Sequence, residues 1–165
     1  MALDVTGLDH ICLAVRDFGT SESFYDGVME LLGFKKGDAP IGGEPHAHYF
    51  NRHLQLSIRP ARSEEPHDPY AAGLHHICLR LADDDAVDTA ALELRTLGVK
   101  VRDPKVHTEY SEDYYAIFFE DPDGIRLERV GRLRIREEII EQWDRLEGFL
   151  NPMQRLQNQE ETPEG

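Results

Sequence analysis

The amino-acid sequence predicts an α+β fold in which two tandem βαβββ modules form one open, barrel-like sheet around a central cavity, followed by a C-terminal helix. The first observation is a repeat: LDHICLAV at residues 8–15 returns as LHHICLRL at 74–81, with five of eight positions identical. The second is spacing, because Gly33 follows His10 by 23 residues and Gly98 follows His76 by 22. Two matched landmarks at matched spacing indicate an internal duplication.

The first module is expected at about residues 7–58. Its opening strand at 8–15 alternates, with Leu13 on the apolar face and His10 on the other. A helix should follow from an N-cap at Thr20 or Ser21 and end at Gly33, which suits a positive φ. Three shorter strands are expected near 34–38, 47–51 and 53–58.

The second module is expected at about residues 74–131. Its helix has an acidic start at residues 83–85, which favours a helix N-terminus. Gly98 is its expected C-terminal glycine. The last two strands are joined by DPDG at 121–124, a sequence typical of a tight turn. The three strands are expected at 99–103, 114–120 and 125–130.

The two modules form one domain at residues 1–131, and the sequence between and after them divides into three further segments. Residues 59–73 hold three prolines and predict a linker between the modules. Residues 132–156 carry an apolar stripe that includes Ile139 and Trp143, which predicts an amphipathic helix. Residues 157–165 are polar, and we expect them to be frayed.

Composition excludes several classes of function. Of the 165 residues, 18 are Lys or Arg and 32 are Asp or Glu, a formal net charge of −14. So negative a protein repels phosphate backbones and anionic lipids, and we therefore expect neither nucleic-acid nor membrane partners. We find no signal-peptide or membrane-span pattern, and a cytoplasmic location is expected. Two cysteines do not make a disulfide framework.

Four side chains stand where the modules can bring them together. His10 and His76 are the repeat-related pair, each at the start of a first strand. Gln55 and Glu128 lie in the last strand of each module, on the face opposite to its apolar residues. Two imidazoles, one amide oxygen and one carboxylate suit a divalent first-row metal and leave open coordination positions. The central cavity is therefore predicted to be a metal cavity.

The runs LDHICLAV, HHICLRL and DPDGIRLE resemble the vicinal oxygen chelate superfamily, over about residues 7–131. This superfamily contains glyoxalase I, methylmalonyl-CoA epimerase, extradiol dioxygenases, and the fosfomycin- and bleomycin-resistance proteins. The resemblance implies metal ligands at the positions of His10, Gln55, His76 and Glu128. A Gln at the second position is similar to the epimerases, whereas many glyoxalases have Glu there.

The resemblance implies a metal-dependent enzyme of the glyoxalase/epimerase type. One divalent ion (Ni, Zn, Co, Mn or Fe), with no organic cofactor, would bind two adjacent oxygens of a small substrate. Proton transfer would pass through an enediolate, with Glu128 as the catalytic residue. The resemblance also implies a homodimer, and both a complete site in one chain and a swapped dimer fit.

Other members of the superfamily leave alternatives open. An Fe(II) extradiol dioxygenase needs two histidines and one carboxylate, which His10, His76 and Glu128 would supply. A bleomycin-resistance-type protein would bind a small molecule without catalysis. A fosfomycin-type transferase is a weaker alternative, because the sequence gives no obvious cation and thiol site.

Several further side chains have two interpretations. Arg80, Arg126 and Tyr114 are candidates for binding substrate, the alternatives being surface ion pairs and aromatic packing. Cys12 and Cys78 share the histidine face, as thiolate ligands or, in the favoured interpretation, as core fillers. His75 is expected on the opposite face as a structural residue. A second metal site at His46, His48 and His53 is weighed against a solvated loop or a cavity-rim strand, which is favoured.

Overall fold

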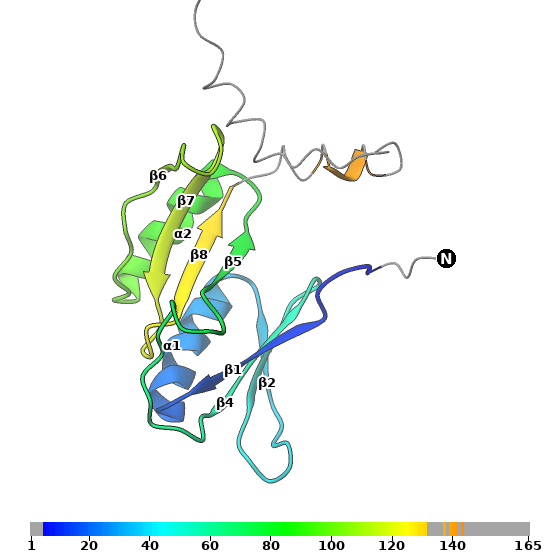
Figure 1. The fold of residues 1–165 in the computed structure, drawn as a ribbon, viewed down its shortest axis with the longest axis vertical. Helices are drawn as coiled ribbons and strands as arrows, with labels where there is room; N and C mark the ends of the chain where they lie inside the picture. The colour runs from blue at the N-terminus through cyan, green and yellow to red at the C-terminus, as the bar shows by residue number, and fades with distance from the viewer. Residues whose placement is uncertain (1–4, 132–136, 138, 142, 144–165) are drawn as a thin grey trace, which may run out of the picture.

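The computed structural model describes residues 5–131, 137, 139–141 and 143, arranged as two βαβββ modules (Figure 1). Each module has one open, four-stranded mixed sheet and one helix, so the chain has the expected α+β fold. The two modules lie one above the other in Figure 1, and helix α1 of module one lies near their junction. Among the described residues no helix is long and apolar enough to cross a membrane.

Module one is built from β1 (His10–Val15), α1 (Phe18–Leu31), β2 (Lys35–Asp38), β3 (Ala47–Phe50) and β4 (Gln55–Pro60). The sheet order is β1-β4-β3-β2, with β1 parallel to β4 and the other pairs antiparallel. Alternation along β1 buries Leu13 and Val15 against α1 and leaves His10 exposed. Strand β4 runs to Pro60, two residues into the predicted linker.

The start of α1 differs from the prediction. The N-cap is Asp17, whose carboxylate accepts a 3.0 Å hydrogen bond from the backbone N–H of Thr20. Thr20 and Ser21 therefore lie inside the helix and do not cap it. An aspartate is as good an N-cap as serine, and the sequence pattern placed the cap one turn too late.

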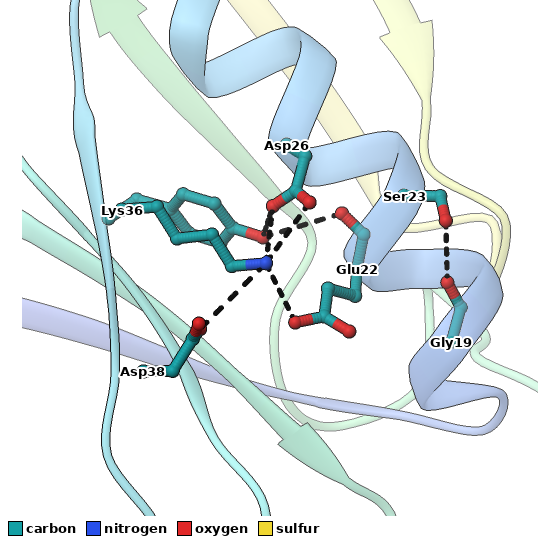
Figure 2. A network of polar contacts seen from close by, with 7 residues as sticks. Gly19, Glu22, Ser23, Asp26, Lys36 and Asp38 are labelled. Carbon is teal, nitrogen blue, oxygen red and sulfur yellow. Dashed lines mark hydrogen bonds and ion pairs between the residues drawn. The ribbon is translucent and has the colours of Figure 1, made fainter.

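A lysine on the edge strand of module one forms ion pairs with the helix of the same module. Figure 2 shows Lys36 of β2 among three carboxylates, with its Nζ 2.8 Å from Glu22 and 3.0 Å from Asp26 of α1, and 3.8 Å from Asp38. Burial opposes the charge, but the hydrogen bonds to Glu22 and Asp26 raise the pKa of Lys36 above its usual value. Tyr49 of β3 joins the network by donating to Asp26 at 2.8 Å.

Module two repeats the order with β5 (His76–Arg80), α2 (Asp84–Thr96), β6 (Lys105–Val106), β7 (Tyr115–Glu120) and β8 (Arg126–Val130). The sheet order β5-β8-β7-β6 matches that of module one. Asp83 caps α2 at its acidic start, and Gly33 and Gly98 both have the expected positive φ, 75° and 80°. The shared order and caps support the duplication.

The second strand of module two lies later in the sequence than expected. Residues 99–103 form no strand, although the N–H of Arg102 donates to the carbonyl of Phe118. The regular ladder with β7 begins at Lys105, directly after Pro104, which has no N–H to donate.

The two modules meet through helices and the turn at 121–124. Helix α1 packs on α2, and the side chain of Leu97 lies against Gly27. Across the same junction Arg16 forms a 2.7 Å ion pair with Asp123. The open faces of the two sheets, which carry His10 and His76, are consequently not covered by the junction.

The predicted C-terminal helix falls mostly outside the described residues. Residues 137 and 139–141 are helical, Trp143 is exposed, and the rest of 132–156, like the tail at 157–165, lies outside the description.

Candidate metal centre in two half-sites

Strands β5 and β8 bring one imidazole and one carboxylate together in module two. His76 Nε2 lies 3.5 Å from Glu128 Oε2, and Glu128 is 3% exposed. The other carboxylate oxygen, Oε1, accepts a 2.6 Å hydrogen bond from the hydroxyl of Tyr114. Burial and this hydrogen bond raise the pKa of Tyr114, which therefore stays a donor. One oxygen of Glu128 is thus held in place while the other faces His76.

These groups line a cavity of about 1510 Å³. Arg126 and His75 line it too, and Arg126 is the register partner of His76 on the neighbouring strand. Its Nη1 lies 3.1 Å from the hydroxyl of Tyr70 and 3.4 Å from His75 Nε2, and its guanidinium stacks 4.8 Å from the Tyr70 ring centroid. Of the three substrate-binding candidates, Tyr114 and Arg126 line the cavity, whereas the exposed Arg80 does not.

Module one contributes a separate set of donors. The side chain of His10 is 60% exposed, with Nδ1 2.8 Å from Asp9, and Gln55 is its register partner on β4. In the described part of the chain no three His, Cys, Asp or Glu side chains lie close enough together to hold a metal ion. The structure therefore brings His76 to Glu128 and His10 to Gln55, but does not join the two pairs within one chain.

The register also sets the equivalence between the modules. Cys12 pairs with Ser57 on β4, whereas Cys78 pairs with Glu128 on β8. Ser57 is thus the repeat equivalent of Glu128, and the equivalent of Gln55 is Arg126. The sequence pattern aligned Gln55 with Glu128, two residues away along the strand.

Three predictions about neighbouring residues need correction. Cys12 and Cys78 are exposed residues and do not fill the core. Although part of Cys78 reaches the surface, desolvation by the protein atoms around its thiol, and then the Glu128 carboxylate, raise the pKa of Cys78 to about 12. His75 directly precedes β5 and lies outside the strand, so strand alternation does not apply, and its Nδ1 is 2.8 Å from His76 Nδ1.

The histidines of the β3 region were predicted to lie in a solvated loop or a cavity-rim strand. His48 lies in strand β3 and His46 directly before it, and both are buried, not solvated, with their rings stacked at 5.7 Å, while His53 is exposed. His48 bonds Ser57, a residue that the sequence analysis did not single out. Ser57 lies two residues after Gln55 on the same strand face, and this spacing was the signal in the sequence that could have identified it.

A sequence profile of the Glyoxalase/Bleomycin resistance protein/Dioxygenase superfamily matches residues 7–128, and the chain belongs to this superfamily. Among curated proteins it is similar to metallothiol transferase FosB of Staphylococcus epidermidis, with 25% identity over 141 residues, 82% of this chain and 89% of FosB.

Solved structures share the fold. A glyoxylase/bleomycin resistance protein/dioxygenase domain from Frankia sp. EAN1pec has a TM-score of 0.65 at 21% identity, covering 78% of this chain and 100% of that one. A mutant of the fosfomycin resistance protein FosX from Listeria monocytogenes, complexed with Mn(II) and 1S,2S-dihydroxypropylphosphonic acid, has a TM-score of 0.60 at 19% identity, covering 82% and 99%.

Proposed function

We propose that this protein is a metal-dependent enzyme that binds a small substrate through two adjacent oxygens and transfers a proton beside them, in the manner of the glyoxalases and epimerases. The observation that carries the proposal is the His76–Glu128 pair, 3.5 Å apart and in the wall of a large cavity. An imidazole nitrogen and a carboxylate oxygen are ligands that first-row divalent ions accept. His76 and Glu128 would hold the ion from module two, and His10 and Gln55 from module one.

When bound, a divalent ion would supply positive charge where negative charge develops on the two substrate oxygens. Glu128 Oε2 is the oxygen that the Tyr114 hydroxyl does not hold, and it would serve in turn as a ligand of the ion and as the acceptor of the substrate proton. The burial of Glu128 keeps water from competing for that oxygen. Arg126 would bind an anionic group of the substrate, since it faces the cavity beside His76 and, among the described residues, its nearest carboxylate, Glu120, is 4.0 Å away.

The two half-sites would be joined between two copies of the chain. His10 is exposed on one module and the His76–Glu128 pair opens into the cavity of the other, so a second copy could supply the missing half to each. Exchange of equivalent elements between protomers gives such an isologous dimer. A homodimer would then contain two identical metal centres.

A second reaction class is favoured by one specific observation. The similarity to the metallothiol transferase FosB, together with the phosphonate and Mn(II) named for FosX, supports group transfer to a phosphonate substrate. Arg126 would then bind the phosphonate. The other two alternatives, an Fe(II) dioxygenase and a non-catalytic binding protein, are supported only by the membership of the superfamily.

Mixing two inactive variants tests the shared centre. His10→Ala and Glu128→Gln chains, unfolded and refolded together, form heterodimers in which one centre has lost both residues and the other keeps both, His10 from one copy and Glu128 from the other. Half of the dimers would be mixed, and activity should recover to about a quarter of wild type. No recovery, with heterodimers demonstrated by native mass spectrometry, would place the centre in one chain.

The reaction class is tested by substrate panels. With Mn(II), Ni(II) or Zn(II), exchange of solvent deuterium into the carbon beside a substrate carbonyl would support proton transfer. Thiol-dependent loss of fosfomycin without such exchange would favour the transferase, and ring cleavage of catechols with Fe(II) under anaerobic loading would favour the dioxygenase. Glu128→Gln should largely abolish turnover while retaining some metal, and full activity in that variant would refute its role.

A further inference from the structure

Three polar side chains that are hydrogen-bonded in series lie on the open face of module one. His48 and Ser57 are register partners on β3 and β4, and both are buried. His48 Nδ1 lies 2.8 Å from Ser57 Oγ, and Ser57 Oγ lies 2.7 Å from Gln55 Nε2. At the other end, His48 Nε2 lies 3.1 Å from the carbonyl oxygen of Ala39.

The position of each proton follows from the hydrogen bond at one end of this series, between His48 and Ala39. A carbonyl oxygen only accepts, so His48 Nε2 carries the proton and donates it to Ala39. Nδ1 of the neutral imidazole is then an acceptor, and the Ser57 hydroxyl donates to it. The Ser57 oxygen in turn accepts from the Gln55 amide nitrogen.

The reverse orientation of the Gln55 amide is excluded by the same contacts. The amide nitrogen also lies 3.2 Å from His48 Nδ1. Exchanging the amide nitrogen and oxygen would place two acceptors at that distance with no proton between them. The nitrogen is therefore fixed toward Ser57, and the carbonyl oxygen of Gln55 has no hydrogen-bond partner in the part of the chain that the structure describes.

We propose that His48 and Ser57 are positioning residues, which hold Gln55 so that its carbonyl oxygen is a neutral ligand beside His10. This inference rests on the proposed metal-dependent function. Gln55 is the register partner of His10, so β1 and β4 offer an imidazole and an amide oxygen side by side. In module two the equivalent positions of Ser57 and Gln55 hold Glu128 and Arg126. One half-site thus supplies neutral donors and the other supplies the charge.

The first test is independent of metal. Long-range ¹H–¹⁵N NMR on the full-length, ¹⁵N-labelled protein reports which ring nitrogen of His48 is protonated. The expected result is a neutral ring with its proton on Nε2. A proton on Nδ1 would overturn the inference, because Ser57 would then accept from His48 and Gln55 would lose its fixed orientation.

The second test measures Mn(II) affinity by calorimetry. Ser57→Ala should weaken Mn(II) binding by about 10- to 100-fold, the usual effect of losing a residue that orients a ligand. Ser57→Thr, which keeps the hydroxyl, should restore it. Gln55→Leu should lose as much, and Ser57→Ala should add little in that background, because both changes remove one interaction. Ser21→Ala, at a buried serine of α1 whose hydroxyl has no partner among the described residues, should bind as wild type.

The outcomes separate the two proposals. Wild-type affinity in Ser57→Ala, or fully additive losses, would overturn the positioning role while leaving the metal-dependent function intact. Absence of Mn(II) binding in the wild type would overturn the ligand role of Gln55 and the proposed function together. Should Ser57→Ala not fold, the Gln55→Leu comparison and the His48 tautomer still decide the matter.

Discussion

The phenol of Tyr25 in module one donates a 2.9 Å hydrogen bond to the carboxylate of Asp121 in module two, 96 residues away in the sequence. The other oxygen of Asp121 accepts the backbone N–H groups of Asp123 and Ile125. One buried carboxylate therefore both closes the turn before β8 and fastens that turn to helix α1.

Removing this hydroxyl should weaken the folded state in a pH-dependent way. Burial raises the pKa of Asp121, and the bonds from Ile125 and Tyr25 oppose that shift. In Tyr25→Phe the ionised carboxylate loses a donor, so we expect a loss of about 1–3 kcal/mol at neutral pH. The loss should shrink as the pH falls through the folded-state pKa, because the protonated carboxyl needs that donor less.

Urea unfolding at about pH 7.5 and about pH 4.5 measures this difference. Tyr115→Phe is the matched control, since it removes a phenol that donates to Asp88 at an exposed site. Its loss should be small. An equal loss for Tyr25→Phe at both pH values would contradict the assignment to Asp121.

Gly131 should not tolerate a side chain. A Cβ at this position would lie 2.9 Å from the backbone carbonyl carbon of Asp83 and the backbone nitrogen of Asp84, at the start of α2. Gly131→Ala should therefore force the strand end and the helix apart and destabilise the protein by about 1–3 kcal/mol. Gly7→Ala, where nothing lies within 4 Å, should be neutral in the same unfolding assay. Equal stability of the two variants would contradict the close approach.

Lys36→Met should destabilise module one in a salt-dependent way. The change leaves Glu22, Asp26 and Asp38 without the ammonium that lies between them (Figure 2). Because the lysine side chain is 31% exposed, we expect a loss of only about 1 kcal/mol. High salt should reduce it by screening the carboxylates. Lys35→Met, one residue earlier and exposed, is the control, and a loss that does not respond to salt would speak against electrostatics.

Tyr114→Phe should weaken metal binding in module two. The variant releases Oε1 of Glu128, so the carboxylate can turn away from His76. We expect Mn(II) affinity to fall by about 10- to 100-fold while the fold is kept. Tyr110→Phe, whose ring packs 5.0 Å from that of Tyr114, should bind normally. Unchanged affinity in Tyr114→Phe would remove it as a support of Glu128.

The duplicated sequence was enough to predict the two modules, because a repeated strand and a glycine at fixed spacing depend only on local structure. It did not predict the strand at Lys105, since the effect of Pro104 depends on which residues face β7. The start of α1 was missed because Asp17, Thr20 and Ser21 are all residue types that favour the N-cap position, so residue type alone did not choose between them.

The site was predictable only in part. The paired histidines stand out because the repeat aligns them, and Glu128 stands out because it follows the DPDG turn on the face opposite to the apolar residues of its strand. The structure places His76 beside Glu128. The equivalence of Ser57 with Glu128 depends on the parallel register of β1 and β4, which alternation cannot supply. The contacts of Arg126 with Tyr70 and His75 bring the linker to the sheet, a long-range arrangement that no local pattern encodes.

Each sheet has two edge strands, and one of them, β1 or β5, has a hydrogen-bonded neighbour on one side only among the described residues. A free strand edge can continue into the edge of another molecule. Whether such joining closes after two molecules or continues into a filament depends on the rotation between the halves of each chain. The bonds from Tyr25 to Asp121 and from Arg16 to Asp123 set that rotation. Variants that loosen these two contacts should therefore change that rotation, and with it the way in which the strand edges of two molecules can meet.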